Sequence, residues 1–392
     1  MMSGGPSSAL LSLAVLANLV LGPGCALIVE GPSSAATVSI LPNGATCLAS
    51  NADMTILIAG TKTGGMMVSS RTTSRGRDQQ RGAAGGGLPP TTWEEVHSDD
   101  YRSKFPVYSI AFAGERDDGD EFVFAGAGDR FVSVWRRRER EERGDSSFEF
   151  VRTLGPHTGW VKALAYSGDA NTLYSIGCNC IESWDVSHIC DDVRHISKRT
   201  IENSPSMGST LSSDLLSLCL LDAICLVSGG VDGRMHCWSL DPTVTKPFFT
   251  GRSHDGRVNA IVHHTPLGLI FSVGHDGMLL ASKLTTSGGG GMETMAAFEV
   301  DGAPRLSALC IVDESPCGCK LGLGSTDGRV VIVRVTASED DDISIAEECR
   351  LEVDGNPMIY SVCKSPARTN GAFGPSILVG HAKDLIEWKY IS

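Results

Sequence analysis

A single unit of sequence recurs along this chain of 392 residues, and its period limits the folds that the chain can adopt. Each unit contains a short apolar segment, a segment rich in small residues, a tight turn, and a segment in which apolar and polar residues alternate. The gaps between successive units are 49, 54, 44, 51 and 55 residues. A period of this size predicts an array of small, similar sheets. The residue six positions after the turn aspartate, or the matching tryptophan, marks six units at Trp135, Trp184, Trp238, Ser282, Val333 and Trp388.

The segments within each unit predict four short strands, so the chain is expected to be all-β. Turns such as Asp232-Gly233 and Asp276-Gly277 are typical of tight reversals between strands. Small residues in the middle strands let neighbouring sheets approach closely. A degenerate unit at 54–70 raises the number of units to seven. We therefore predict a single seven-bladed β-propeller over residues 36–392. Inner strands are expected at 107–113, 258–263, 306–312 and 359–363, middle strands at 122–126, 269–274, 321–325 and 377–380, and outer strands at 148–154 and 344–353.

Two consecutive units between Gly155 and Leu240 resemble the repeats of the WD40 family. The first contains Gly155-Pro156-His157 and ends in Trp184-Asp185, and the second ends in Val231-Asp232-Gly233 followed by Trp238. Many WD40 proteins close their ring by pairing the two ends of the chain. Here the last unit stops after its third strand, at 385–391. The resemblance therefore implies that the segment 36–41 supplies the missing outer strand, which would remove two exposed sheet edges.

WD40 units often contain a buried hydrogen-bonded chain of His, Ser or Thr, Asp and Trp, and the resemblance implies a structural role for the matching residues here. None of the three best units is complete: Cys178 stands where the third unit would have Asp, the fourth unit lacks the His, and Ser282 replaces the Trp of the fifth. A Ser-His-Asp set within one blade imitates a catalytic triad in sequence. Because buried polar groups need partners, we expect these sets to fasten loops to strands rather than to catalyse. The matching residues are His157, Ser175, Trp184, Ser228, Asp232, Trp238, His254, Ser272 and Asp276.

No residue pattern for catalysis, cofactor binding or metal binding is found, and the chain is expected not to be an enzyme. The 13 cysteines are scattered, many of them in apolar strand-like segments, which favours buried free thiols. The pairs Cys178/Cys180 and Cys317/Cys319 lack the spacing of a zinc site. A nucleophile elbow, a phosphate-binding loop and the His-Glu-x-x-His motif are all absent from the sequence.

The formal net charge of −13 argues against a general nucleic-acid binder, which usually presents a basic face. The run 136–143 mixes both signs and is interpreted as a solvated loop. The segment 69–90 is rich in Ser, Thr, Arg, Gln and Gly and is predicted to be a disordered insertion loop. Its four arginines form a basic patch, which is interpreted as part of a solvated linker rather than as a docking site.

Partner binding is expected where the inner strands begin, because in propellers these positions ring the narrow face. A protein or peptide partner is predicted, with Trp160 and Arg257 as the main contacts, since exposed Trp and Arg are enriched in binding hot spots. The alternative is that Trp160 packs on its own loop. The residues at these positions are Pro106, Trp160, Arg257, Arg305 and Met358.

The first 26 residues differ from the rest of the chain. An apolar run at 9–21 is too short to span a bilayer comfortably, and small residues follow it up to Ala26. This pattern indicates a secretory signal peptide cleaved after Ala26, although no Lys or Arg precedes the run. The alternative is a disordered leader. The chain has no proline-free Asn-x-Ser/Thr site, so an organelle such as a plastid also fits, with cytoplasm or nucleus if the leader is not functional.

A rigid ring with variable loops and no converging reactive groups favours a non-enzymatic scaffold for protein–protein interaction. One alternative is a ubiquitin-ligase substrate receptor, a class that often carries Trp-Asp-x-Arg. Here Trp184-Asp185-Val186-Ser187 lacks the Arg. The other alternative is a propeller enzyme with an axial active site, which the apolar inner strands disfavour. The sequence identifies neither the partner nor the oligomeric state.

Overall fold

The structure is a computed structural model. It describes residues 27–389 with the exception of 31–34, 40, 42–43, 52–54, 71–92, 97, 99–100, 102, 115–120, 140–145, 191–197, 203–213, 222–224, 242, 286–290, 303–304, 339, 366–375 and 382–383.

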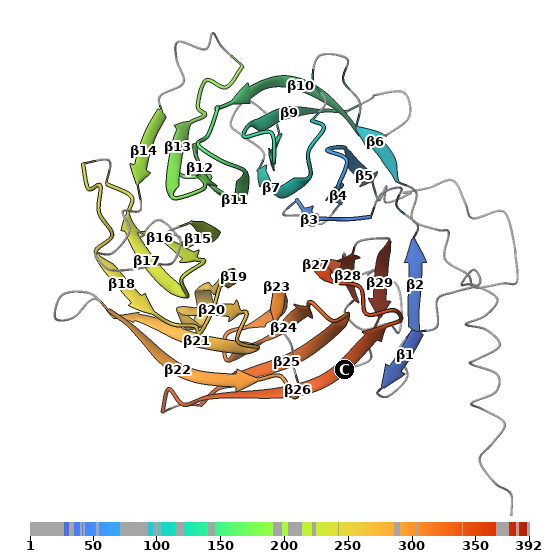
Figure 1. Cartoon of the computed structure of the whole chain (residues 1–392), viewed down its shortest axis with the longest axis vertical. Helices are drawn as coiled ribbons and strands as arrows, with labels where there is room; N and C mark the ends of the chain where they lie inside the picture. Colours follow the sequence, from blue (N-terminus) through green and yellow to red (C-terminus); the bar gives the residue numbers. More distant parts are fainter. Residues whose placement is uncertain are drawn as a thin grey trace, which may run out of the picture.

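The described strands form seven antiparallel sheets arranged as a ring, so the predicted seven-bladed β-propeller is confirmed (Figure 1). Within blades 1 to 5, numbered in chain order, consecutive strands are hydrogen-bonded neighbours. Blade 1 contains β3 (Cys47–Ser50), β4 (Ile56–Gly60), β5 (Met66–Ser70) and β6 (Glu94–Val96); blade 2 contains β7 (Val107–Ala113), β8 (Phe122–Ala127), β9 (Val132–Glu139) and β10 (Ser146–Leu154); blade 3 contains β11 (Val161–Ser167), β12 (Thr172–Gly177), β13 (Cys180–Asp185) and β14 (Lys198–Glu202).

The remaining blades follow the same plan, with one short 3-10 turn, η2 (Thr265–Leu267), inside blade 5. The inner, middle and outer strands of this half match the predicted ranges closely. Blade 4 contains β15 (Leu215–Leu221), β16 (Cys225–Gly230), β17 (Arg234–Ser239) and β18 (Phe249–Arg252); blade 5 contains β19 (Val258–His264), β20 (Leu269–Gly274), β21 (Met278–Thr285) and β22 (Gly291–Glu299); blade 6 contains β23 (Leu306–Ser315), β24 (Gly318–Ser325), β25 (Arg329–Ala337) and β26 (Ile343–Val353); blade 7 contains β27 (Ile359–Ser365), β28 (Ser376–His381) and β29 (Leu385–Lys389).

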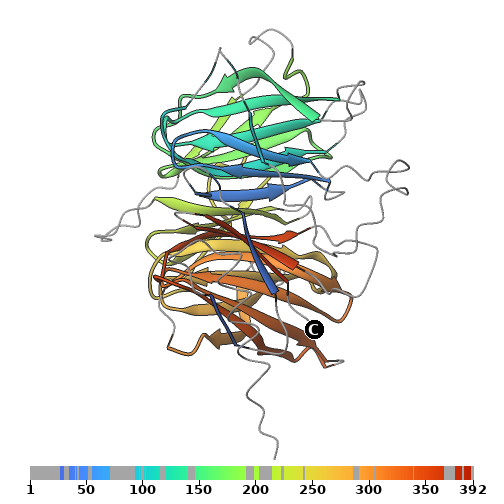
Figure 2. The same cartoon turned by 90° about the vertical axis from the view of Figure 1, so that its right-hand side faces the viewer.

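Blade 7 is completed by the other end of the chain. β2 (Ala35–Ser39) pairs antiparallel with β29, with Ala36 opposite Trp388 and Val38 opposite Ile386. The N-terminal strands, in blue, therefore lie beside the C-terminal strands, in red (Figures 1 and 2). The predicted closure of the ring is confirmed, and the edge of β29 is covered by β2.

One strand was not predicted. β1 (Leu27–Glu30) pairs with the outer strand of blade 6, β26, with Leu27 opposite Val353 and Glu30 opposite Arg350. Blade 6 thus has five strands, and the first strand of the propeller begins nine residues before the predicted start at residue 36. Because β1 belongs to blade 6 and β2 to blade 7, the N-terminal segment spans two neighbouring blades.

Glycines in the middle strands explain how closely the blades pack. A Cβ atom at Gly126 of β8 would lie 2.6 Å from Cγ1 of Val161, the first residue of the next blade's inner strand. Gly229 of β16 faces Val258 in the same way, with a corresponding distance of 2.5 Å. Any larger residue would have to push the blades apart, so the small residues set the distance between neighbouring sheets.

Some predicted segments lie outside the described residues, and one is wrong. The predicted leader at 1–26 and the part of the predicted insertion loop beyond Ser70 lie outside them. The expectation of a solvated loop at 136–143 is wrong in its first half, because 136–139 continue β9 and pair with Ser146–Glu149 of β10. Two arginines of this run form ion pairs with the neighbouring strand: Arg136 and Arg138 lie 3.1 and 3.0 Å from Glu149. None of the described residues forms a helix long and apolar enough to cross a membrane.

Candidate interaction surface

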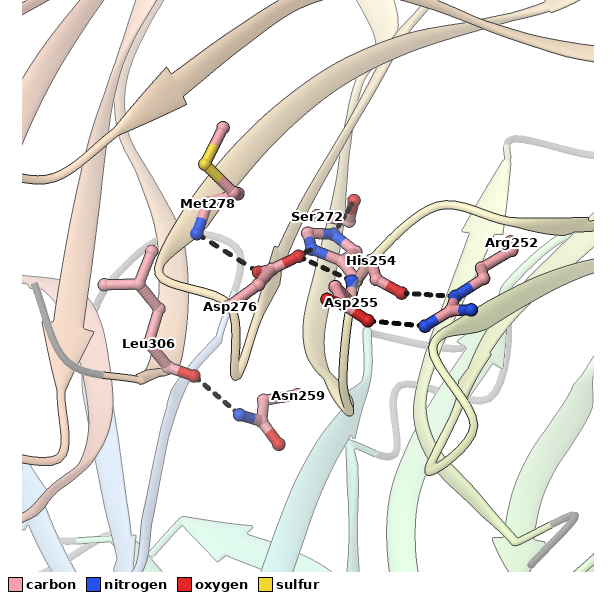
Figure 3. A network of polar contacts seen from close by, with 8 residues as sticks. All are labelled: Arg252, His254, Asp255, Asn259, Ser272, Asp276, Met278 and Leu306. Atoms are coloured by element: carbon pink, nitrogen blue, oxygen red, sulfur yellow. Dashed lines mark hydrogen bonds and ion pairs between the residues drawn. The ribbon is translucent and has the colours of Figure 1, made fainter. Parts of the chain in front are cut away.

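The inner strands line the centre of the ring (Figure 1). Hydrogen bonds between neighbouring inner strands fix this arrangement near their first residues. Ser217 of β15 donates its Oγ–H to the carbonyl of Val258, the first residue of β19, over 3.0 Å. Asn259 of β19 donates from Nδ2 to the carbonyl of Leu306, the first residue of β23, over 2.6 Å (Figure 3). The residues just before these strands therefore lie around one end of the ring, which we call the mouth of the ring.

The structure places each predicted partner-binding residue directly before an inner strand. Trp160 precedes β11 and has 52% of its surface exposed, and Met358 precedes β27 with 37% exposed. Arg257 and Arg305 are exposed and precede β19 and β23, while Pro106 is half-buried and precedes β7. These residues are far apart in the sequence, and the propeller brings them to the same mouth.

Aromatic rings occupy the side of the mouth formed by blades 2 and 3. Trp160 stacks on Tyr108 of the neighbouring blade, with ring centroids 5.7 Å apart and planes 19° apart. The ammonium group of Lys162 lies 3.7 Å from the centroid of Tyr108 and 4.6 Å from that of Trp160. Trp160 therefore does more than pack on its own loop: it joins two blades, and half of its surface remains exposed. Sequence reasoning missed Tyr108 and Lys162, because their contact with Trp160 depends on how the blades are placed.

Two more residues extend this aromatic side. Phe105, next to Pro106, has 50% of its surface exposed. Tyr360, the second residue of β27, has the ammonium group of Lys62 over its ring at 5.0 Å from the centroid. Exposed apolar surface and cations stacked on aromatic rings thus occur together at the mouth. A cation–π contact at an exposed site contributes about 0.5–1 kcal/mol.

Positive charge gathers on the side formed by blades 5 and 6. The backbone N–H of His275, in the turn between β20 and β21, donates to the carbonyl of Arg257 over 2.9 Å. Burial, followed by the charges of Arg305 and Arg257, lowers the pKa of His275. Burial and then the charge of Arg257 likewise lower the pKa of Lys162. These basic groups therefore lie close enough to oppose one another's charge.

The loop that carries Arg257 is held by a buried network in blade 5 (Figure 3). His254 contacts Ser272 Oγ through Nε2 at 2.9 Å and the Asp276 carboxylate through Nδ1 at 3.0 Å. The carboxylate also accepts from the backbone N–H groups of Asp255, at 2.9 Å, and Met278, at 3.2 Å. Burial opposes ionisation of Asp276, but these hydrogen bonds outweigh it and lower its pKa. Ser272 and His254 are buried, and their hydrogen bonds connect the loop before β19 to the turn after β20.

Blade 3 contains a related network that supports the loop of Trp160. His157 Nε2 lies 2.7 Å from Ser175 Oγ, and Trp184 donates its Nε1–H to the same oxygen over 2.9 Å. The Glu182 carboxylate, 2% exposed as a residue, lies 3.1 Å from His157 Nε2. Cys178 occupies the turn position expected for Asp, and Glu182 supplies a carboxylate from β13 instead. The sequence could have indicated this role, because Glu182 lies two residues before Trp184 and the two side chains therefore share one face of the strand.

Blade 4 contains the expected Ser228, Asp232 and Trp238, and blade 2 contains a set that was not predicted. In blade 4, Trp238 donates to Ser228 Oγ over 2.8 Å, and Asp232 accepts from the backbone N–H of Arg234 over 3.1 Å. In blade 2, Tyr101 donates its hydroxyl to Asp129 over 2.6 Å and therefore takes the place of a histidine. Burial raises the pKa of Tyr101. Sequence reasoning missed Tyr101 because it looked for His at that position.

The described residues contain no group of three or more His, Cys, Asp or Glu side chains that is arranged to hold a metal ion. The cysteines in the part of the chain that the structure describes are free thiols. Of the two close pairs, Cys180 and Cys319 are buried, while Cys317 is exposed.

No protein-family model matches the chain, and no curated protein matches it either.

Proposed function

We propose that this protein is a non-enzymatic scaffold that binds a protein partner at the mouth of the ring. The observation that carries the proposal is where the exposed apolar side chains lie. Among the described residues, five large apolar side chains are exposed, and three of them, Phe105, Trp160 and Met358, stand at the entrances of inner strands. We call the following set the mouth surface: Phe105, Tyr108, Trp160, Lys162, Arg257, Arg305 and Met358.

The composition of the mouth surface supports binding to a protein. Interfaces are enriched in aromatic residues, Met and Arg, and their hot spots are enriched in Trp, Tyr and Arg. Trp160 and Tyr108 are held against each other before any partner arrives, so little side-chain entropy is lost when they bind.

The charge of the mouth surface supports an acidic partner segment. The whole chain has a formal net charge of −13, yet this surface carries Lys162, Arg257 and Arg305. A basic patch attracts an acidic segment of a partner. The rest of this acidic protein repels such a segment, so the basic patch is where it binds best. A segment with apolar and acidic side chains matches both halves of the mouth.

The proposal is tested by placing a photo-crosslinking amino acid in the full-length protein, at Met358 or at Val244. Val244 is an exposed apolar residue between β17 and β18 and serves as the control. Each version is made with the native mouth and with Trp160→Ala/Arg257→Ala. We expect a protein crosslinked from position 358, absent from position 244 and lost in the double variant. The proposal is wrong if the crosslinked proteins are the same from both positions, or persist in a correctly folded double variant.

A further inference from the structure

Three basic side chains from separate segments converge at one side of the mouth. Arg257 precedes β19, His275 lies between β20 and β21, and Arg305 precedes β23. The His275–Arg257 backbone hydrogen bond, 2.9 Å, fixes the first two relative to each other. The hydrogen bond from Asn259 to the carbonyl of Leu306, 2.6 Å, holds the start of β23 against β19 (Figure 3). The convergence is therefore set by the backbone of two adjacent blades.

Among the described residues, no acidic side chain pairs with Arg257 or Arg305. In the part of the chain that the structure describes, neither the Arg257 nor the Arg305 guanidinium forms an ion pair or a side-chain hydrogen bond, whereas Arg329 lies against Asp327 and Arg350 against Glu347. The nearby Asp276 carboxylate is already engaged by His254 and two backbone N–H groups.

We propose that Arg257, His275 and Arg305, which we call the anion corner, bind an oxyanion carried by a side chain of the partner. This inference rests on the proposed function and specifies the partner's chemistry. Guanidinium groups present paired N–H donors that match the oxygens of a carboxylate or a phosphate. An apolar residue of the same partner segment would contact Trp160, on the side of the mouth formed by blades 2 and 3. The partner segment thus carries an apolar residue together with an acidic or phosphorylated one.

Binding of an oxyanion is coupled to protonation of His275. The groups that face its imidazole are the Arg257 and Arg305 charges, which oppose protonation, and the Asp276 charge, which favours it; burial opposes it most. An oxyanion beside the ring adds negative charge and raises the pKa of His275 in the complex. A group whose pKa rises on binding takes up a proton, so the affinity increases as pH falls, by at most about tenfold per pH unit.

The test measures oxyanion binding to the full-length protein by isothermal titration calorimetry. The probes are inorganic phosphate, succinate and O-phosphoserine, each at constant ionic strength. We compare wild type with Arg305→Gln, with His275→Gln, and with Arg334→Gln as the control, since Arg334 is exposed on the outer part of blade 6 and pairs with Glu348. We expect saturable binding that weakens about tenfold or more in Arg305→Gln, because hydrogen bonds to charged groups contribute this much, and is unchanged in Arg334→Gln. Comparing succinate with the two phosphates shows which oxyanion the corner prefers.

The pH dependence separates a specific site from general charge attraction. Wild-type affinity should rise between pH 8 and pH 5.5 for succinate, whose charge changes little over the upper part of this range, and His275→Gln should flatten the rise. Equal weakening in Arg305→Gln and Arg334→Gln, or the absence of saturable binding, overturns the anion corner. Crosslinking from Met358 that survives Arg305→Gln but is lost in Trp160→Ala refutes only the anion corner and leaves the proposed function standing.

Discussion

Replacing Gly126 with alanine should destabilise the seam between blades 2 and 3. The new Cβ would lie 2.6 Å from Cγ1 of Val161, 2.8 Å from Ser109 Oγ and 3.1 Å from Val161 Cβ. Since ordinary carbon contacts are about 3.5–4 Å, the methyl contact must open by about 1 Å. Overpacking a tight core typically costs about 1–3 kcal/mol. The smaller conformational entropy of the unfolded alanine chain offsets about 0.4–1 kcal/mol of this, so we expect a net loss of about 1–2 kcal/mol.

The reasoning is checked by a double-mutant cycle in urea denaturation. Val161→Ala removes the nearest methyl group, so Gly126→Ala should cost less in that background, with a coupling energy of about 1 kcal/mol. The matched control is Gly168→Ala, because no atom lies within 4 Å of a Cβ at Gly168. That control should change the unfolding free energy by less than about 0.5 kcal/mol. The packing argument fails if Gly126→Ala is as stable as Gly168→Ala, or if its cost is the same with and without Val161.

Three further predictions concern the buried networks and the thiols. The pKa of Asp276 is lowered in the folded protein, so its carboxylate stabilises the fold fully above the unfolded pKa of about 3.9. This contribution is lost as pH falls through the lower folded pKa. The free energy of unfolding between pH 2 and 6 should therefore depend less on pH in Asp276→Asn than in wild type. Glu182→Gln should cost about 1–3 kcal/mol in thermal or urea denaturation, because it weakens a buried contact, whereas Glu149→Gln, at an exposed pair, should cost less than about 1 kcal/mol; equal effects would contradict the buried role. Among the described cysteines, the exposed Cys190 and Cys317 should react first with a thiol reagent, as mass spectrometry of the labelled peptides would show, and prior labelling of a buried thiol would contradict the structure.

Local patterns were enough to predict the blades. Each signal involves residues that are near one another in the chain: an Asp-Gly turn, the small residues before it and the alternating strand after it. Strands such as β7 (Val107–Ala113) and β20 (Leu269–Gly274) accordingly match their predicted bounds. The closing strand β2 was also predictable, because the last unit lacked one strand and a suitable segment preceded the first.

Only the tertiary structure decided the details that give the ring its candidate binding surface. β1 was missed because four residues carry no period, and their pairing with β26 joins segments at opposite ends of the chain. Tyr108 and Trp160 meet because two blades are placed side by side, and Arg257 and Arg305 converge because two inner strands begin at the same mouth. The sequence by itself determined the repeating unit, since its signals are local. The contacts between units depend on the distance and rotation between blades, which no spacing along the chain records.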